Sequence, residues 1–216
     1  MAEAIINNGP SQEKLLKLTR FLKPIRIGEI VLKTSRYPEM KAWYQAVLGV
    51  ETFFESKLKA ASSLGTKPGE LKPAGNVIQL CFFRVHMEYP YGQMVVLFHV
   101  SGIGDRPTND PGLHHMQFRH ASFEDTIVRY ERLCSAGIKP FRTATHGPFT
   151  SFYYHDPDGN SVELFGSNFD TEEEYLGYFK TESFAENHAG IDVDPEEFVR
   201  RFRSDAPQSN LLKFSV

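Results

Sequence analysis

The clearest feature of the chain is an order of strand-like and helical hydrophobic patterns that occurs twice. In the first half, a strand-like run at 27–34 precedes a helical apolar face over 38–48, which a glycine follows. Three further strand-like runs follow at 50–54, 77–85 and 94–100. Apolar spacings of two and of about 3.6 residues are typical of strands and of amphipathic helices. The first half therefore predicts one β-α-β-β-β unit.

The second half repeats this order of elements. A strand-like run at 113–119 precedes an amphipathic helix over 123–136, and a short strand and a β-hairpin complete the copy. Neither copy, 25–101 or 112–167, could bury its sheet face alone, so the two should pack together. We therefore predict an α+β fold in which two βαβββ modules form one eight-stranded, cup-shaped sheet.

Segments of a different kind flank and interrupt the modules. Residues 1–24 predict an N-terminal helical extension, and residues 168–216 predict a C-terminal arm with a short helix that Asp194 caps. Residues 56–76 are rich in Lys, Ser, Gly and Pro, so we expect a long loop there, which is a candidate lid.

Bulk composition narrows the function classes only a little. A net charge of −3 over 216 residues gives no reason to expect a nucleic-acid or acidic membrane partner. The sequence shows no leader-like start and no apolar run near the length of a membrane span, which favours a soluble, cytoplasmic protein. Cys81 and Cys134 lie in apolar contexts, so we expect free buried thiols.

The last hairpin carries the most informative polar residue. The turn 156–160, Asp-Pro-Asp-Gly-Asn, joins two strand-like runs, and Glu163 stands between Val162 and Leu164 in the second of them. A buried carboxylate is costly unless it is paired or bound to a metal. The alternative is an edge-strand glutamate that faces water. When the two halves are aligned, Val96 takes the place of Glu163.

Three motifs taken together identify a family resemblance. They are Gly-Leu-His-His at 112–115, His-Gly-Pro-Phe-Thr-Ser-Phe-Tyr at 146–153, and Asp-Pro-Asp-Gly-Asn-Ser-Val-Glu-Leu at 156–164. With the duplicated module, they resemble the vicinal oxygen chelate superfamily, which includes glyoxalase I, bleomycin-resistance proteins and type I extradiol dioxygenases. The resemblance covers about 25–167 and is strongest to single-domain extradiol dioxygenase-like proteins.

The resemblance implies a divalent metal ion in the cup between the modules. Carried over residue by residue, it makes His115, Glu163 and Glu29 the metal ligands, and Glu29 aligns with His115 when the halves are superposed. A three-ligand face with open positions suits chelation of two adjacent substrate oxygens. Tyr153 matches the tyrosine that donates to a substrate oxygen, and His146 matches a histidine that orients substrate.

Two departures from the dioxygenase pattern keep the chemistry open. Glu29 stands where those enzymes have a histidine ligand, so the set is harder and suits Mn(II), Mg(II) or Zn(II) as well as the Fe(II) that the resemblance implies. The ring-cleaving enzymes also carry an acid–base histidine pair where this chain has Gln93 and Met94. His86 and His99 are the remaining candidates for that role.

We therefore expect a metal-dependent enzyme that acts on a small, oxygen-rich aromatic or phenolic substrate, with extradiol dioxygenase-like ring cleavage as the main hypothesis. The alternatives are a redox-neutral isomerase, lyase or cyclase, in which Glu29 holds the metal or takes a proton, and a non-catalytic ligand-binding protein. Tyr153 could instead be a core tyrosine, and His146 could be a loop residue without a role in the site. We expect His114 to face away from the site. A homodimer is an expectation from the resemblance.

Overall fold

The computed structural model describes residues 11–13, 16, 25–58, 76–89, 91–104, 112–187 and 189–204. Most of the predicted N-terminal helix and nearly all of the candidate lid lie outside these residues. The expected division at 1–24, 25–101, 112–167 and 168–216 stays a prediction.

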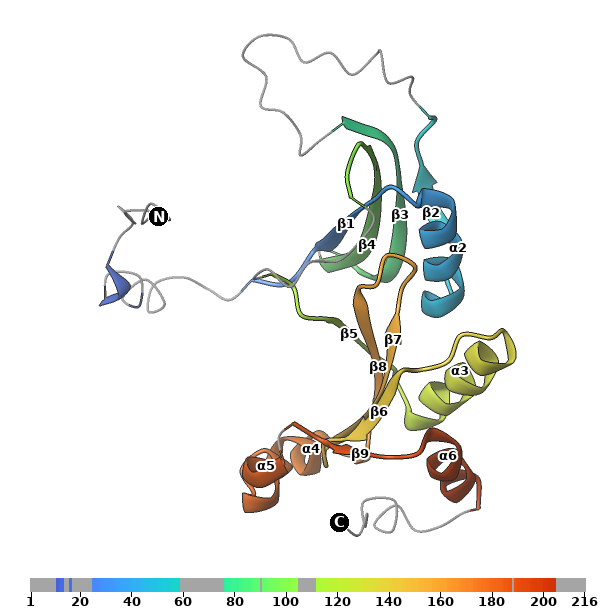
Figure 1. The fold of residues 1–216 in the computed structure, drawn as a ribbon. Helices are drawn as coiled ribbons and strands as arrows, with labels where there is room; N and C mark the ends of the chain where they lie inside the picture. Colours follow the sequence, from blue (N-terminus) through green and yellow to red (C-terminus); the bar gives the residue numbers. More distant parts are fainter. Residues whose placement is uncertain are drawn as a thin grey trace, which may run out of the picture.

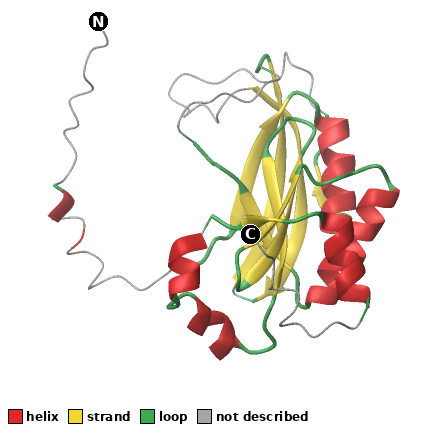
Figure 2. Cartoon of the chain, turned by 60° about the horizontal axis from the view of Figure 1, so that its bottom comes forward, coloured by secondary structure: helices red, strands yellow, loops and turns green. Residues whose placement is uncertain are grey.

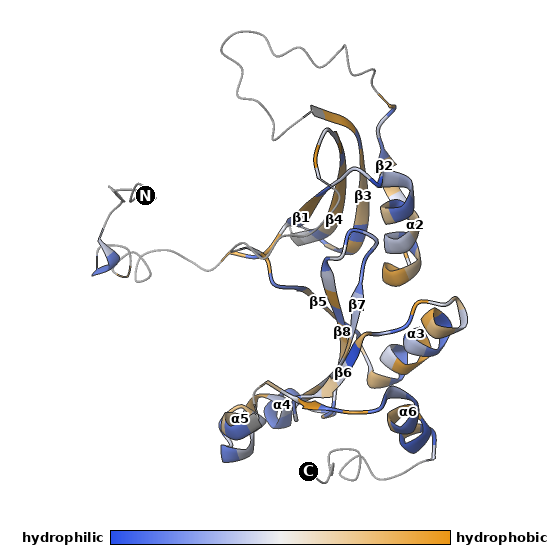
Figure 3. Ribbon diagram, in the orientation of Figure 1, coloured by the Kyte–Doolittle hydropathy of each residue, from blue (hydrophilic) through white to orange (hydrophobic). Residues whose placement is uncertain are grey.

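The first module has the predicted order of elements (Figure 1). Its strands form a four-stranded sheet in the order β1-β4-β3-β2, with β1 parallel to β4 and the other pairs antiparallel. Figure 3 shows that β3 and β4 are strongly apolar, as expected for strands that build a core. The elements are β1 (Glu29–Thr34), α2 (Tyr37–Leu48), β2 (Thr52–Glu55), β3 (Asn76–Glu88) and β4 (Tyr91–Ser101).

The second module repeats the first, which confirms the predicted duplication. Its first strand again pairs in parallel with its last, and the sheet order is β5-β8-β7-β6 with β9 added at the edge. The prediction of one continuous eight-stranded sheet was wrong, because the strands divide into a four-stranded and a five-stranded sheet. The elements are β5 (Met116–Arg119), α3 (Phe123–Ser135), β6 (Arg142–Thr145), β7 (Phe149–His155) and β8 (Ser161–Ser167).

The C-terminal arm supplies β9 (Ile191–Asp192) and three helices, α4 (Glu172–Tyr178), α5 (Glu182–Asn187) and α6 (Pro195–Arg203). Asp194 caps α6 as predicted, since its Oδ1 accepts a hydrogen bond of 2.8 Å from the Glu197 amide. Phe198 of α6 is fully buried in the core. Figures 1 and 2 show the longer helices together on one side of the strands, with α4 and α5 toward the other side.

One hydrophobic core joins the two modules. It combines the inner faces of α2 and α3 with residues from both sheets, among them Met40, Val47, Phe83, Ile127 and Leu164. A buried hydrogen bond of 2.9 Å also crosses between the modules, from the Tyr44 hydroxyl to Oδ2 of Asp156 in the β7–β8 turn. The modules are therefore held together as one body.

Two buried tyrosines allow a matched test of this cross-module bond. Tyr44→Phe should lower the free energy of unfolding by about 1–3 kcal/mol, because it removes a donor from a buried carboxylate. Within the described part of the chain, the buried hydroxyl of Tyr154 has no hydrogen-bond partner. Tyr154→Phe should therefore be neutral or stabilising. Urea unfolding of both variants measures the difference, and equal losses would contradict the role of the Tyr44 bond.

Candidate metal and substrate site

The candidate site is built on one row of residues that crosses the second sheet. In register, Gln117 of β5 pairs with Glu163 of β8, Glu163 pairs with Tyr153 of β7, and Tyr153 pairs with Arg142 of β6. Residues in such a row project to the same face of a sheet. Their neighbours Val162 and Leu164 point the other way, into the core beneath α3. The row therefore lies on the sheet face opposite α3.

Glu163 is a deeply buried carboxylate with a full set of partners. Its side chain is only 2% exposed. Oε1 accepts hydrogen bonds from the Ser151 hydroxyl at 2.5 Å and from Nε2 of Gln117 at 3.0 Å. Oε2 lies 2.9 Å from Nε2 of His115. Ser151 and Gln117 thus fix the carboxylate through one oxygen and leave the other turned to the imidazole.

A second histidine orients the His115 ring through Nδ1, the nitrogen that does not face Glu163. This nitrogen lies 2.7 Å from Nδ1 of His114, so one of the two rings donates and the other accepts. The expectation that His114 faces away was wrong, because residues 113–115 precede β5 and do not follow strand alternation. Metal-ligating histidines are commonly held by a hydrogen bond at the ring nitrogen that does not face the metal, and His114 is placed to hold His115 in this way.

Tyr153 and His146 form a second pair beside the carboxylate. The Tyr153 hydroxyl lies 3.0 Å from Nε2 of His146. Burial, strengthened by the negative charge of Glu163, raises the pKa of Tyr153 to about 12. The phenol therefore stays protonated at neutral pH and can donate a hydrogen bond.

The C-terminal arm holds His146 in place. The His146 ring stacks on Phe149 with centroids 4.7 Å apart. On another side it lies against Gly190, where an added Cβ would stand 2.7 Å from the imidazole Cε1. Gly190 also has a positive φ of 83°. A glycine beside β9 thus permits the close approach of the arm to this histidine.

Glu29 is the predicted ligand that the structure leaves apart from the others. It is exposed on β1, in the other sheet. Among the described residues, no group of three His, Cys, Asp or Glu side chains is placed to hold a metal ion. Within one chain, therefore, His115 and Glu163 meet and Glu29 does not join them. Its role as a ligand stays a prediction.

The first sheet carries the apolar counterpart of the polar row. In register, Val31 pairs with Val96, Val96 with Phe82, and Phe82 with Phe54. When the two modules are superposed, this row takes the place of the Glu163 row. Val31 lies two residues from Glu29 on β1, so the row is on the same face as Glu29. Val31 is 39% and Phe54 50% exposed. The duplicated fold thus presents one polar and one apolar version of the same sheet face.

The other candidate histidines have different partners. His86 lies 3.7 Å from Glu88 at the surface, and His99 stacks on Tyr37 with centroids 5.4 Å apart. Neither contacts the Glu163 cluster in the part of the chain that the structure describes. His155 stacks on Phe141 at the end of β7.

Comparison with known proteins now identifies the family. The model of the Glyoxalase/Bleomycin resistance protein/Dioxygenase superfamily matches residues 26–164, a span that ends one residue after Glu163. The chain belongs to this superfamily. The match confirms the resemblance predicted from the sequence motifs.

Two curated members of the superfamily are similar over most of the chain. Biphenyl-2,3-diol 1,2-dioxygenase 3 of Rhodococcus globerulus is 32% identical over 189 residues, which are 86% of this chain and 86% of that protein. Biphenyl-2,3-diol 1,2-dioxygenase 2 of the same organism is 31% identical over 170 residues, 79% of this chain and 77% of that protein. These relatives confirm the prediction of a dioxygenase-like enzyme.

Among solved structures, a glyoxalase/dioxygenase from Nostoc punctiforme covers 68% of this chain and 95% of its own, with 16% identity and a TM-score of 0.48. None of the helices in the described residues is long and apolar enough to span a membrane.

Proposed function

We propose that this superfamily member is a metal-dependent extradiol dioxygenase, which cleaves the ring of a catechol-type substrate next to its two hydroxyls. The observation that carries the proposal is the buried Glu163 carboxylate, 2.9 Å from His115 on a sheet face that also presents Tyr153 and His146. The relatives named as biphenyl-2,3-diol dioxygenases support a phenolic substrate.

The donor set fits a divalent metal ion. Two ligand bonds of roughly 2.1 Å at a right angle place their donor atoms about 3 Å apart, which matches the spacing of His115 Nε2 and Glu163 Oε2. Both side chains are braced from the far side, by His114 on one and by Ser151 and Gln117 on the other. A bound ion would supply Lewis acidity to two adjacent substrate oxygens. We propose Fe(II), because ring oxidation by dioxygen needs a redox-active metal.

The chain's own groups position the substrate and its protons. Tyr153, protonated because its pKa is raised to about 12, donates a hydrogen bond to a substrate oxygen. His146 then donates from Nε2 to the phenol oxygen, 3.0 Å away, and holds the phenol in place. Arg142, the last residue of the row, lies over the Tyr153 ring, with its Cζ 5.3 Å from the ring centroid.

We infer further that Glu29 reaches this site from a second copy of the chain. The shared core and the Tyr44–Asp156 bond hold the two modules of one chain together, so Glu29 cannot swing onto its own His115. In a homodimer, the face with Glu29, Val31 and Phe54 would lie over the Glu163 row of the partner. The apolar row would then cover the substrate ring while the polar row engages its oxygens.

A second candidate function is a redox-neutral isomerase or lyase reaction. It is favoured by Glu29 in place of a histidine and by Gln93 and Met94 in place of the acid–base pair. A harder ligand set suits Mn(II), Mg(II) or Zn(II), which can polarise substrate oxygens without oxidation.

Oxygen consumption separates the two functions. The purified protein with 2,3-dihydroxybiphenyl should consume one dioxygen per substrate, with both oxygen atoms appearing in the ring-opened product. An oxygen electrode and mass spectrometry after incubation under ¹⁸O₂ measure this directly. Binding of the catechol without oxygen uptake, in iron-loaded protein, would reject the dioxygenase and favour the redox-neutral reaction.

A further inference from the structure

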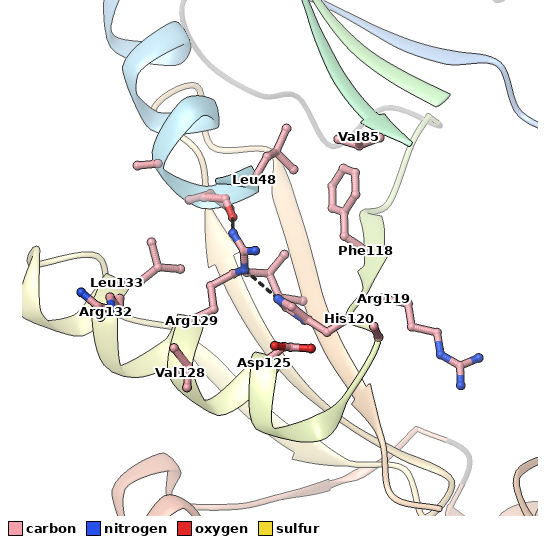
Figure 4. Close-up of a pocket in the computed structure, with 14 residues that line it drawn as sticks. Leu48, Val85, Phe118, Arg119, His120, Asp125, Val128, Arg129, Arg132 and Leu133 are labelled. Atoms are coloured by element: carbon pink, nitrogen blue, oxygen red, sulfur yellow. Dashed lines mark hydrogen bonds between the residues drawn. The ribbon is translucent and has the colours of Figure 1, made fainter. Parts of the chain in front are cut away.

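A cavity of about 560 Å³ opens on the other side of the second sheet from the Glu163 row (Figure 4). It lies between the end of α2, β5 and α3, so its walls come from both modules. Its volume falls within the range of small-molecule sites, roughly 300–1,000 Å³. The apolar part of its lining is formed by Val47, Leu48, Val85, Phe118, Val128, Leu133 and Leu164.

Arg129 is the central polar group of this cavity. It reaches from α3 to the end of α2, where Nη1 donates a 2.7 Å hydrogen bond to the Val47 carbonyl, and Nε donates to Nε2 of His120 at 2.7 Å (Figure 4). Within the described residues, its Nη2 makes no hydrogen bond and the guanidinium has no carboxylate in ion-pair contact. A half-buried cation without an anion is costly.

Among the described residues, no neighbouring group forms an ion pair with this guanidinium, although the charge of the Asp125 carboxylate favours it from a longer distance. His120 accepts from Arg129 at Nε2, which leaves its proton on Nδ1, and burial with the adjacent cation lowers the pKa of His120. The Asp125 carboxylate is engaged at the start of α3, where it accepts from the amide and hydroxyl of Ser122. Arg132 adds a second cation to the lining. The cavity thus combines apolar walls with the Arg129 guanidinium, in a lining that also includes Arg119, Arg132 and Asp125.

We propose that this cavity is a second ligand site, which binds a small organic carboxylate with an apolar body. The carboxylate pairs with Nη2 of Arg129, the guanidinium nitrogen that His120 and the Val47 carbonyl leave unbonded. The apolar body lies against Leu48, Phe118 and Leu133. Because the walls belong to both modules, the bound ligand bridges them, at a site separate from the metal.

Titration of the full-length protein with benzoate, followed by ligand-observed NMR, tests the proposal. Benzoate should bind saturably, and benzamide, which has the same shape without the charge, should bind at least tenfold more weakly. Arg129→Met should weaken benzoate binding at least tenfold. Arg200→Met, on an exposed face of α6, is the matched control and should leave binding unchanged.

Two further variants test whether benzoate binds in this cavity and not at the Glu163 site. Val128→Trp fills the cavity from an exposed position on α3 without touching the Arg129 bonds, and it should also abolish benzoate binding. Glu163→Ala should leave benzoate binding intact, which separates this site from the metal site and from the proposed dioxygenase function. No saturable benzoate binding to the wild type, equal affinity for benzamide, or full binding in Val128→Trp would overturn the proposal.

Discussion

Glu163→Ala should abolish metal binding and catalytic turnover while the protein stays folded. The variant removes one of the two proposed ligands that meet in the chain and leaves His115 without its anionic partner. The fold should persist, because the core beneath α3 is built from the opposite face of β8, through Val162 and Leu164. Elemental analysis and circular dichroism of the purified variant measure both outcomes.

The conservative variant and a surface control sharpen this test. Glu163→Gln keeps the shape and can still accept from Ser151 and Gln117, but it lacks the negative charge, so it should also lose the metal. Glu173→Ala, in the exposed first turn of α4, should retain metal and activity. Stoichiometric metal in folded Glu163→Ala would refute the assignment of this carboxylate as a ligand.

Mixing two inactive variants should restore activity if Glu29 serves the site of a second copy. Glu29→Ala and Glu163→Ala should each be nearly inactive as homodimers. In a mixed dimer with two-fold symmetry, one site receives both substitutions and the other receives neither. Random reassociation makes about half of the dimers mixed, so about a quarter of all sites, and of wild-type activity, should return.

The same experiment distinguishes the other roles of Glu29. Co-expression with two affinity tags isolates the mixed dimer, and the double variant Glu29→Ala/Glu163→Ala mixed with wild type is the control. If no activity returns in the mixed dimer, the two residues do not share a site across the interface. If Glu29→Ala retains full metal occupancy, Glu29 acts as a base or a bystander.

The sequence predicted the parts of the site that depend on strand order. The duplicated pattern placed His115 within a strand at 113–119 and Glu163 in the last strand. The strand β5 begins only at Met116, but its parallel pairing with β8 still brings the two side chains together. Strand alternation could also have identified Ser151, which lies two residues from Tyr153 on β7, and strand pairing could have identified Gln117, which lies opposite Glu163. We did not predict them, because a serine or a glutamine in a strand has no distinctive pattern, and only the contact with Glu163 reveals its role.

Other features depended on contacts that no local pattern records. His114 left the strand alternation because it precedes β5, so its ring could turn to His115. The two-residue strand β9 carries no periodicity, yet it extends the second sheet and brings Gly190 against His146. The position of Glu29 is set by packing between modules, through α2, α3 and the β7–β8 turn.

The decisive measurement for the proposed site of His115 and Glu163 is the metal content of the wild-type protein, purified without added metal salts. We expect about one redox-active divalent ion per chain, iron above all, which is lost on replacement of His115 or Glu163 and not on replacement of His146. Fully folded, catalytically active protein that contains no divalent metal would contradict it.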